Sequence, residues 1–432
     1  MNDLPPDPRA GVLHRASALT ALDLAAVSFV ALVARIVWHL VVPARDWPDT
    51  AVYLQTGHAL LSSGFMSSTN YMPVYPLAIS LTGHGGIIPV QLVVSAFSAA
   101  LVQVITFDVF GSRQAALFSG LIAALYPPLI FYANMRLTET LYIALVLMAF
   151  ASFYRGAFLV GSISLVVSIL TRPSLDLLAP LLVVAFCVAR RETGPSTIAR
   201  RLALYGLVYV ALMAPWWWHN WHLYHVFVRL DLAMGNLLII ENSDLFDRVG
   251  LDFEALAPAW ERFYGISDPI ARDRAMVDAA LDYIRNNPVH WLWRCVDRFV
   301  RFWSFVPGSQ SRMVNVVSIM TTLPVTALAI LALVRLVHFP AKWIRSPVEN
   351  AAPGKAEDVS IRAETAPGVR RLLPVLPILV LVAYLTAVHT VTHGIPRYRL
   401  PLEPFLIVLA GFGASTLATL VGRGLRHGSD RA

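Results

Sequence analysis

Charged side chains are scarce in this sequence. Asp, Glu, Lys and Arg together make up 14% of the 432 residues, whereas hydrophobic residues make up 57%. A soluble globular protein carries roughly 25% charged residues. A water-soluble core cannot absorb so large an apolar fraction, but a bilayer can, provided that the backbone polar groups are bonded within helices or a closed barrel. The scarcity of charge therefore excludes an ordinary soluble enzyme and indicates a membrane protein.

Cysteine and lysine are also nearly absent. Cys187 lies in an apolar run and Cys295 in an expected outer loop, so we expect them to be too far apart for a disulfide. The lysines, Lys342 and Lys355, fall in one polar stretch. The net charge of +7 thus comes from arginines in short clusters between apolar runs, as in membrane-protein loops. The sequence has no basic helix with interleaved aromatic residues, the pattern that would indicate nucleic-acid binding.

Long apolar runs are what the sequence has in abundance. They are unbroken over roughly 20 residues, the length that a helix needs to cross a bilayer, whereas barrel strands would alternate over roughly ten residues. The sequence therefore predicts an all-α polytopic membrane protein. A piece at 71–81 is too short to span and predicts an interfacial or re-entrant element. About ten spans are expected, at 19–42, 87–108, 114–133, 137–154, 156–171, 174–189, 202–218, 313–337, 372–392 and 400–421.

Arginines are unevenly distributed over the loops between these runs. Most lie on the side of the N-terminus, and the short loops of the other side hold only Arg45, Arg136, Arg172, Arg397 and Arg399. Because loops rich in Lys and Arg stay in the cytoplasm, we expect a cytoplasmic N-terminus. The expected organisation is a cytoplasmic tail (1–18), a seven-span module (19–218) with its first outer loop at 43–86, an outer region (219–311), three C-terminal spans (312–421) with a cytoplasmic loop (338–371), and a cytoplasmic tail (422–432).

The first outer loop contains the acid of greatest interest, Asp49. One interpretation is that Asp49 is the N-cap of a short helix, with its carboxylate accepting backbone N–H bonds. The other is a carboxylate that a rigid helix start holds at the membrane surface, available as a general base; both can hold together. Asp46 is a competing acid in the same loop, although its neighbour Arg45 suggests a simple surface ion pair.

Two further charged positions lie at or within predicted spans. Glu139 lies at the outer end of the span 137–154. An ionisable group at that depth suggests a functional site, while an acid at a helix N-terminus is also favoured by the helix dipole, and both interpretations stay open. Arg35 and His39 are four residues apart, and therefore lie on one face of the first span. For Arg35 we expect snorkelling to the membrane interface.

An arginine pair on the outer side runs against the charge bias. Arg397 and Arg399 flank Tyr398, which suggests an anionic ligand, because the planar guanidinium group donates two hydrogen bonds to a phosphate. The alternative is an anchor for lipid headgroups. Three histidines after the seventh span lack the Glu of a zinc-binding helix, so we interpret them as part of an interfacial loop: His219, His222 and His225.

With these motifs in place, the sequence resembles the GT-C membrane glycosyltransferases, in particular the bacterial branch similar to protein mannosyltransferases and lipid A aminoarabinose transferases. The resemblance covers nearly the whole chain and depends on the order and spacing of short motifs. The most specific is Arg397-Tyr398-Arg399-Leu400-Pro401 with Glu403-Pro404. The others are Asp49-x-x-x-Tyr53, Tyr75-Pro76-Leu77, Tyr126-Pro127-Pro128, Thr138-Glu139, Thr171-Arg172-Pro173, Pro215-Trp216 with Asn220, Gly235-Asn236-Leu237, and Tyr283-Ile284 with Asn287-Pro288.

The resemblance implies outer juxtamembrane helices and an inverting transfer of a sugar from a polyprenyl-phosphate donor to an acceptor hydroxyl on a glycan, lipid or protein. Asp49 matches the family's catalytic carboxylate, and Glu139 falls near its second outer-loop acid. Many relatives carry another acid directly after the first, where this chain has Thr50, so a metal-chelating loop and a need for a divalent cation stay open. The implied substrate-binding residues are Arg397, Tyr398, Arg399, Tyr53 and Arg172.

Such a reaction needs few protein groups. A lipid phosphate leaves as a stabilised anion, so a base for the acceptor proton and cations for the phosphate suffice. We expect it at the outer face of the bacterial inner membrane, where a flipped lipid carrier replaces nucleotide sugars. The alternatives are a transporter or flippase of a lipid-linked sugar and a non-catalytic envelope assembly protein. A transporter would place ionisable groups near mid-membrane, often in repeated halves, whereas these candidates lie at the outer edge.

Overall fold

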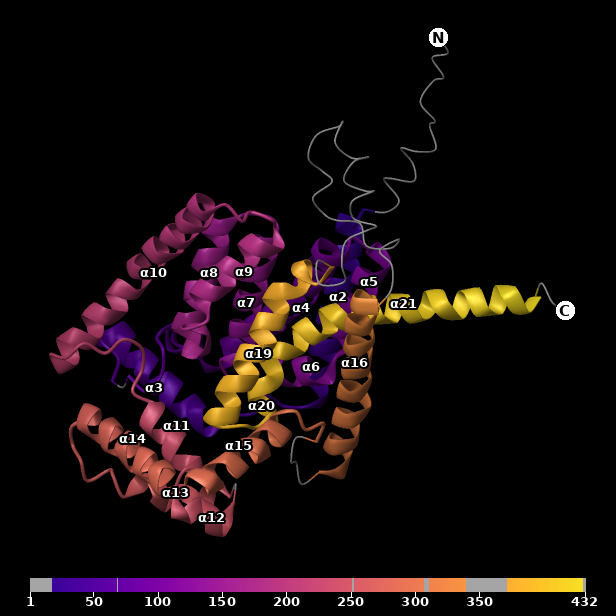
Figure 1. The fold of residues 1–432 in the computed structure, drawn as a ribbon. Helices are drawn as coiled ribbons and strands as arrows, with labels where there is room; N and C mark the ends of the chain where they lie inside the picture. Colours follow the sequence, from indigo (N-terminus) through magenta and orange to yellow (C-terminus); the bar gives the residue numbers. More distant parts are fainter. Residues whose placement is uncertain (1–17, 68, 251, 307–310, 339–370, 430–432) are drawn as a thin grey trace.

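The protein is helical throughout the residues that its computed structural model describes, which are 18–67, 69–250, 252–306, 311–338 and 371–429 (Figure 1). The expected N-terminal tail and most of the loop 338–371 lie outside them. No β-strand occurs in the described residues, which confirms the all-α class. The helices are α2 (Ala21–Val41), α3 (Pro48–Ser63), α4 (Val74–Phe110), α5 (Arg113–Leu125), α6 (Pro127–Ala133), α7 (Glu139–Tyr154), α8 (Phe158–Thr171), η1 (Pro173–Leu175), α9 (Ala179–Ala189), α10 (Pro195–Tyr224), α11 (Met234–Glu241), α12 (Asp244–Val249), α13 (Phe253–Glu261), α14 (Pro269–Asn286), α15 (Pro288–Phe302), α16 (Arg312–His338), η3 (Leu373–Val375), α19 (Leu376–Val391), α20 (Pro396–Arg399), η4 (Leu400–Leu402) and α21 (Glu403–Ser429).

Six helical segments of the described chain are long and apolar enough to cross a membrane, and a seventh is formed if α5 and α6, which are bent by 49°, count as one span. The six are α2, α4, α10, α16 and the segments 373–391 and 396–421. Apolar side chains of α2 such as Leu22, Phe29 and Leu40 are exposed, as in helices that face lipid. The chain is thus a multi-pass membrane protein. The expected ten spans stay a prediction, because α7, α8 and α9 have only 16, 14 and 11 residues.

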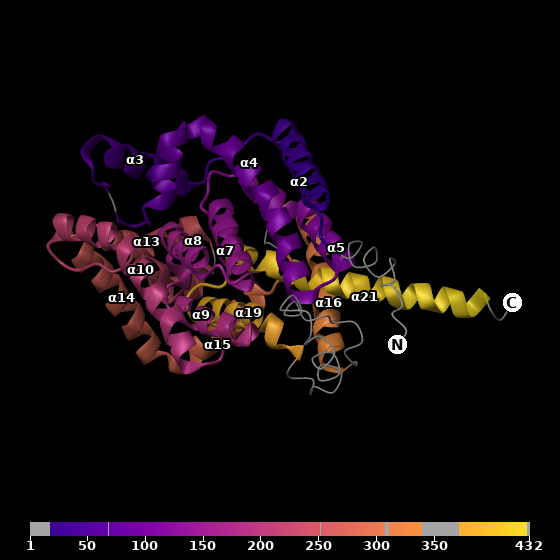
Figure 2. The ribbon, with the colours of Figure 1, turned by 90° about the horizontal axis from the view of Figure 1, so that it is seen from above.

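One kinked helix, α4, contains most of the short apolar piece predicted at 71–81, from Val74 on, and the span that follows it. The kink is at Gly83, with φ 76° and ψ 164°, a backbone conformation that is open to glycine and very costly for other residues. The first arm of α4 lies along α3 (Figure 2). Tyr53 of α3 shares a buried apolar cluster with Tyr75 and Ile79 of that arm. The kink therefore lets the first arm support α3, which carries Asp49.

The last span, α21, packs very closely against its neighbours. A Cβ atom on Gly411 would lie 2.6 Å from the carbonyl oxygen of Ala115 in α5, and one on Gly413 would lie 2.1 Å from the carbonyl oxygen of Leu328 in α16. Small residues at such positions let membrane helices approach to backbone contact. This packing holds α21 in place. The residues just before α21, 396–402, include Arg397 of the candidate site.

Helices α11–α15 lie together on one side of the molecule, with α15 next to α19 and α20 (Figure 1). Ile239, Met276 and Ala280 form a small core between α11 and α14. Helix α15 has two contrasting faces, since Arg294 and Arg298 are buried while its apolar residues at the other face are exposed. The combination is typical of a helix that lies in the membrane interface and agrees with the expected juxtamembrane helices. The exposed apolar residues are Val289, Leu292, Trp293, Val296, Phe299 and Val300.

Candidate active site

Asp49 lies in the first turn of α3, behind Pro48 and the N-cap residue Trp47. The Trp47 backbone N–H donates to Thr50 Oγ1 at 3.0 Å, and the Thr50 hydroxyl donates to the Arg136 carbonyl at 3.1 Å. Thr50, the residue that departs from the family pattern, therefore fastens the start of α3. The interpretation of Asp49 as the N-cap is wrong, because the helix begins at Pro48 with Trp47 as its N-cap residue, and the Thr50 side chain accepts from the Trp47 backbone N–H. The Asp49 carboxylate is left for other partners.

The partners of Asp49 come from two distant segments. The Tyr71 hydroxyl donates to Asp49 Oδ1 at 2.9 Å, and Arg397 Nη2 lies 3.6 Å from Oδ2. Burial and the Asp49 carboxylate raise the pKa of Tyr71 above its usual range, so the phenol stays protonated and keeps donating. The Asp49 side chain is 28% exposed. The structure thus holds a partly accessible carboxylate by one oxygen and places its other oxygen beside a guanidinium group.

Glu139 joins two arginines that are far apart in the sequence. It is the first residue of α7 and is fully buried. Its Oε1 accepts from Arg397 Nε at 2.6 Å and from Arg172 Nη1 at 2.9 Å. A buried carboxylate is tolerated when it is paired in this way. Because one carboxylate serves two guanidinium groups, these three side chains carry one excess positive charge, and Asp49 lies beside it at Arg397. The N–H groups that Glu139 does not use remain available to bind an anion.

Aromatic rings support the two arginines. The Arg172 guanidinium lies 5.1 Å from the Tyr398 ring centroid, and the Arg397 guanidinium lies 5.7 Å from that of Trp47. Such contacts restrict the orientation of a guanidinium plane. Tyr53 is buried and packs edge-to-face against Tyr71, with ring centroids 4.7 Å apart. Tyr53 therefore acts on the Asp49 contact through Tyr71, and Tyr398 lies beside Arg172 itself.

The structure does not place Arg399 in this group. Its Nε donates to Glu403 Oε1 at 2.6 Å, and its Nη1 donates to the carbonyls of Phe302 and Ser304 at 3.0 and 2.8 Å. Arg399 therefore connects the end of α15 to the start of α21. The side chains of Arg397 and Arg399 are only 17% and 5% exposed. Their burial beside protein carboxylates does not fit the alternative of headgroup anchors.

One predicted surface contact, the ion pair of Asp46 with Arg45, differs in the structure. Asp46 pairs with Arg136 at 2.7 Å and His84 at 2.9 Å rather than with Arg45. Partial burial acts against ionisation, but His84 and Arg136 together lower the pKa of Asp46. Its side chain is 51% exposed. Asp46 is thus an ion-paired surface acid outside the Asp49 group, and the prediction of an Arg45 pair is wrong because Arg136 reaches back from the end of α6.

Arg35 does not snorkel to the interface, and that prediction is wrong. The side chain is completely buried, and its N–H groups donate to Ser95 Oγ at 2.7 Å and to the carbonyls of Ala31 and Ala124 at 2.9 and 2.8 Å. Ala124 lies in the last turn of α5, where Pro127 and Pro128 have no N–H to donate to the carbonyls of Ala123 and Ala124. Arg35 therefore caps α5 at the bend. His39, one turn further along α2, forms a hydrogen bond between its Nδ1 and Asn134 Oδ1 at 2.7 Å.

Two of the three predicted loop histidines, His219 and His222, lie in the last turns of α10, and the third, His225, is its C-cap residue. The contacts of His219 and His222 are structural. His219 Nε2 accepts from the Met66 backbone N–H at 2.8 Å, and His222 stacks on Phe65 with ring centroids 4.5 Å apart. They fasten the end of α10 to the loop after α3. Among the described residues, no group of three or more His, Cys, Asp or Glu side chains is arranged to hold a metal ion.

A second charged network, not predicted from the sequence, contacts the residues just before α20, the short helix that carries Arg397 and is called the Arg397 turn below. Glu241 of α11 is fully buried and pairs with Arg298 at 2.9 Å, with Arg301 at 2.6 Å and with His393. Arg298 also donates to the Val391 carbonyl at 3.0 Å. Glu241 thereby joins α11 and α15 to the loop that leads into α20. The available signal was a single acid directly after the apolar residues 237–240.

The comparisons with known proteins agree with this architecture. No protein-family model matches the chain, and no curated protein matches it significantly. The chain is similar to the solved structures of the Archaeoglobus fulgidus oligosaccharyltransferase in the apo form and of AglB from the same organism in complex with an inhibitory peptide and a dolichol-phosphate. Both are 11% identical, with TM-scores of 0.54 and 0.55, and each match covers 94% of this chain and 51% of the other.

A further solved structure, ArnT from Cupriavidus metallidurans bound to undecaprenyl phosphate, is 16% identical over 89% of this chain and 76% of that one, with a TM-score of 0.42. This chain spans about half the length of the archaeal enzyme. The archaeal oligosaccharyltransferase is a GT-C glycosyltransferase. At such low identity the similarity to the archaeal structures shows the fold, and it confirms the GT-C architecture expected from the sequence motifs.

Proposed function

We propose that this protein is an inverting glycosyltransferase that moves a sugar from a polyprenyl-phosphate donor to an acceptor hydroxyl at the outer face of the membrane. The observation that carries the proposal is the meeting of Asp49, Glu139, Arg172 and Arg397, which come from four separate segments of the chain. A base and an anion site side by side are the two features that transfer from a lipid phosphate requires.

In this mechanism Asp49 is the general base. The acceptor oxygen attacks the anomeric carbon as its proton passes to Asp49, and the bond between that carbon and the phosphate oxygen breaks. Polyprenyl phosphate leaves from the opposite face of the sugar, so the anomeric configuration inverts. Tyr71 occupies Oδ1 of Asp49, which leaves Oδ2, the oxygen beside Arg397, to take the proton. The base is thus held next to the group that binds the leaving phosphate.

Arg397 and Arg172 bind the donor phosphate. Each already gives one N–H to Glu139, so each guanidinium plane is fixed before the donor arrives, and such preorganisation lowers the cost of stabilising developing charge. Glu139, the second predicted catalytic acid, serves in this scheme as a positioning residue. Arg399 is also a positioning residue, since its N–H groups donate to Glu403 and to two backbone carbonyls and so hold the turn that contains Arg397.

The reaction class is supported by the shared fold and by the dolichol-phosphate in the similar archaeal AglB complex. The donor panel is the direct test. Membranes containing the protein are incubated with a series of polyprenyl phosphates that carry different radiolabelled sugars, and the label is followed into lipid-free or newly glycosylated products. We expect transfer from at least one donor. Movement of intact labelled donor across the membrane without transfer would instead establish a flippase.

Replacing Arg397 by alanine is expected to raise the donor KM by about 10–100-fold. Hydrogen bonds to charged groups contribute about 1.5–3 kcal/mol, and each 1.4 kcal/mol is tenfold. The measurement is initial transfer rate against donor concentration. Arg45→Ala is the matched control, because Arg45 is an exposed arginine of the same outer face. An equal change in both variants would show that general surface charge, rather than a site at Arg397, attracts the donor.

A further inference from the structure

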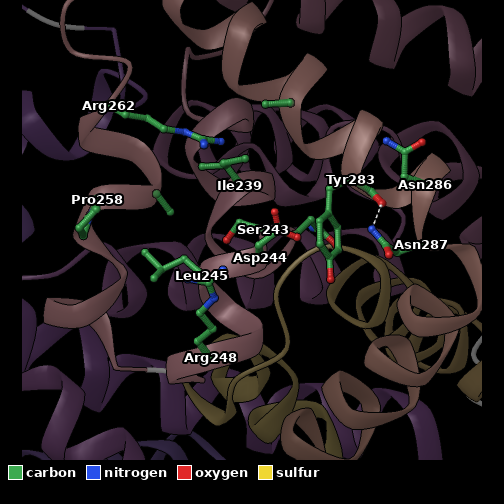
Figure 3. Close-up of a pocket in the computed structure, with 13 residues that line it drawn as sticks. Ile239, Ser243, Asp244, Leu245, Arg248, Pro258, Arg262, Tyr283, Asn286 and Asn287 are labelled. Atoms are coloured by element: carbon green, nitrogen blue, oxygen red, sulfur yellow. Dashed lines mark hydrogen bonds between the residues drawn. The ribbon is translucent and has the colours of Figure 1, made fainter.

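A cavity of about 600 Å³ lies among helices α11, α12, α13 and α14, outside the Asp49 group (Figure 3). Ligand sites in proteins commonly enclose ~300–1,000 Å³. In Figure 3 the Arg262 side chain extends over Ile239 from one side, and Asn286 and Asn287 lie on the other. The cavity is therefore large enough for one or two sugar rings and is built from four helices rather than from one loop.

The walls of the cavity combine two kinds of surface. Ile239, Leu245, Pro258 and Ala259 supply apolar area. The ring of Tyr283 lies between Ser243 and Asn287 (Figure 3). The Tyr283 hydroxyl is fixed by Asp247 Oδ2 at 2.6 Å. A sugar ring has the matching character, with apolar C–H faces and a polar edge of hydroxyl groups. The polar wall is made of Ser243, Asp244, Arg248, Arg262, Asn286 and Asn287.

The charged residues of the polar wall differ from the neighbouring arginines in that they form no ion pair with a described residue. Arg285, Arg294 and Arg301 of α14 and α15 each pair with a carboxylate. In the described part of the chain, Asp244, Arg248 and Arg262 line the cavity without an ion-pair partner. Unpaired guanidinium and carboxylate groups together bind vicinal hydroxyls and acidic substituents well, since both can hydrogen-bond in pairs. Two positive charges against one negative charge favour a neutral or acidic ligand over a basic one.

The cavity wall is connected to the reaction centre by hydrogen bonds. Asn242, which also lines the cavity, accepts from Arg298 Nη2 at 2.8 Å. Arg298 binds Glu241 and the Val391 carbonyl. A Cβ atom on Gly394 would lie 2.4 Å from the Arg298 carbonyl oxygen, so the chain just before Arg397 touches α15 directly. A ligand in the cavity is thus held by the same rigid unit that fixes the Arg397 turn.

We propose that this cavity is the recognition site for a saccharide portion of the acceptor, a hydroxyl-rich neutral or acidic glycan. The inference rests on the proposed function, because it assigns the cavity to the acceptor of that reaction. The sugar ring stacks against the apolar wall and Tyr283, while Arg262, Arg248 and Asn286 bind its hydroxyl or carboxylate groups. The acceptor hydroxyl then extends from the cavity towards Asp49, so the bound unit is separate from the one that is modified.

The test uses the full-length protein in membranes, the labelled donor, and a cell-envelope extract as the acceptor source. Arg262→Ala combined with Asn286→Ala is expected to raise the extract concentration for half-maximal transfer by about tenfold or more, the effect of losing about 1.4 kcal/mol of binding, with donor KM unchanged. Arg274→Ala, an exposed arginine of α14 outside the cavity, is the control. Ala259→Trp, which fills the cavity, gives an independent second variant.

The outcomes separate the two proposals. If wild-type transfer occurs and depends on Asp49, but the cavity variants match the control, the cavity inference is overturned and the proposed function stands. If the wild type transfers no sugar, the function itself fails. The ligand class is tested on the extract: periodate oxidation, which cleaves vicinal diols, should abolish acceptance and protease digestion should not. The reverse result would identify a peptide acceptor and refute the saccharide assignment.

Discussion

Replacing Asp49 by asparagine should reduce sugar transfer to the background rate while the donor KM changes little. A general base contributes about 10²–10⁴-fold to the rate, and the amide cannot take the acceptor proton. The substitution conserves shape, and the asparagine Oδ1 can still accept from Tyr71, as the carboxylate does at 2.9 Å. Arg172 and Arg397, which we propose bind the phosphate, stay in place through Glu139. The measurement is kcat and donor KM with the donor that the panel identifies.

The same substitution at Asp46 provides the control for Asp49. Asp46 lies just before α3, close to Asp49 in the sequence, and its side chain is 51% exposed and paired with Arg136 and His84. Exposed ion pairs contribute about 0–1 kcal/mol, so Asp46→Asn should retain nearly full transfer. If both variants lose activity together, the loop rather than the base is at fault. If Asp49→Asn transfers sugar at the wild-type rate, Asp49 is not the base.

The parts of the site that the sequence predicts are those carried by short motifs. Asp49 and Arg397 were identified separately, and the structure brings their side chains to 3.6 Å. Arg172 and Glu139 were also identified one at a time, and their shared hydrogen bond joins α7 to the turn after α8. The motifs do not indicate which of the two neighbouring arginines, Arg397 or Arg399, lies beside Asp49. Arg397 does and Arg399 does not, because α20 is a tight turn that directs the two side chains to different partners.

The parts that could not be predicted depend on tertiary contacts. Arg35 looks like any interfacial arginine near the end of a span, and only the bend between α5 and α6 supplies the carbonyl groups that bury it. The break in α4 at Gly83 is similarly invisible to an apolar pattern, since glycine is common in membrane helices. Glu241 is the clearest case, because its partners on α15 and at His393 lie far along the chain. Local sequence contains no information on such pairings.

Glu241 leads to the second large expected effect. Glu241→Gln keeps the shape of the side chain but leaves Arg298, Arg301 and His393 without their common carboxylate. Removing one partner of a buried ion pair costs about 3–5 kcal/mol, so the unfolding temperature of the solubilised protein should fall markedly at neutral pH. The donor KM should rise as well, because the loop before Arg397 loses its attachment to α11. Glu254→Gln is the control, since Glu254 is an exposed acid of α13.

The pH dependence separates loss of charge from loss of packing. Burial raises the pKa of Glu241, but His393 and Arg301 lower it more, from the ordinary value of 4.5 to about 2. The carboxylate therefore contributes stability that is fully present above pH 4.5 and is lost as the pH falls towards 2. The difference in unfolding temperature between the wild type and Glu241→Gln should shrink over that interval, because protonation removes the same charge from the wild type. If the difference in unfolding temperature stays constant down to pH 2, the charge of Glu241 does not hold α11 and α15 to the Arg397 turn.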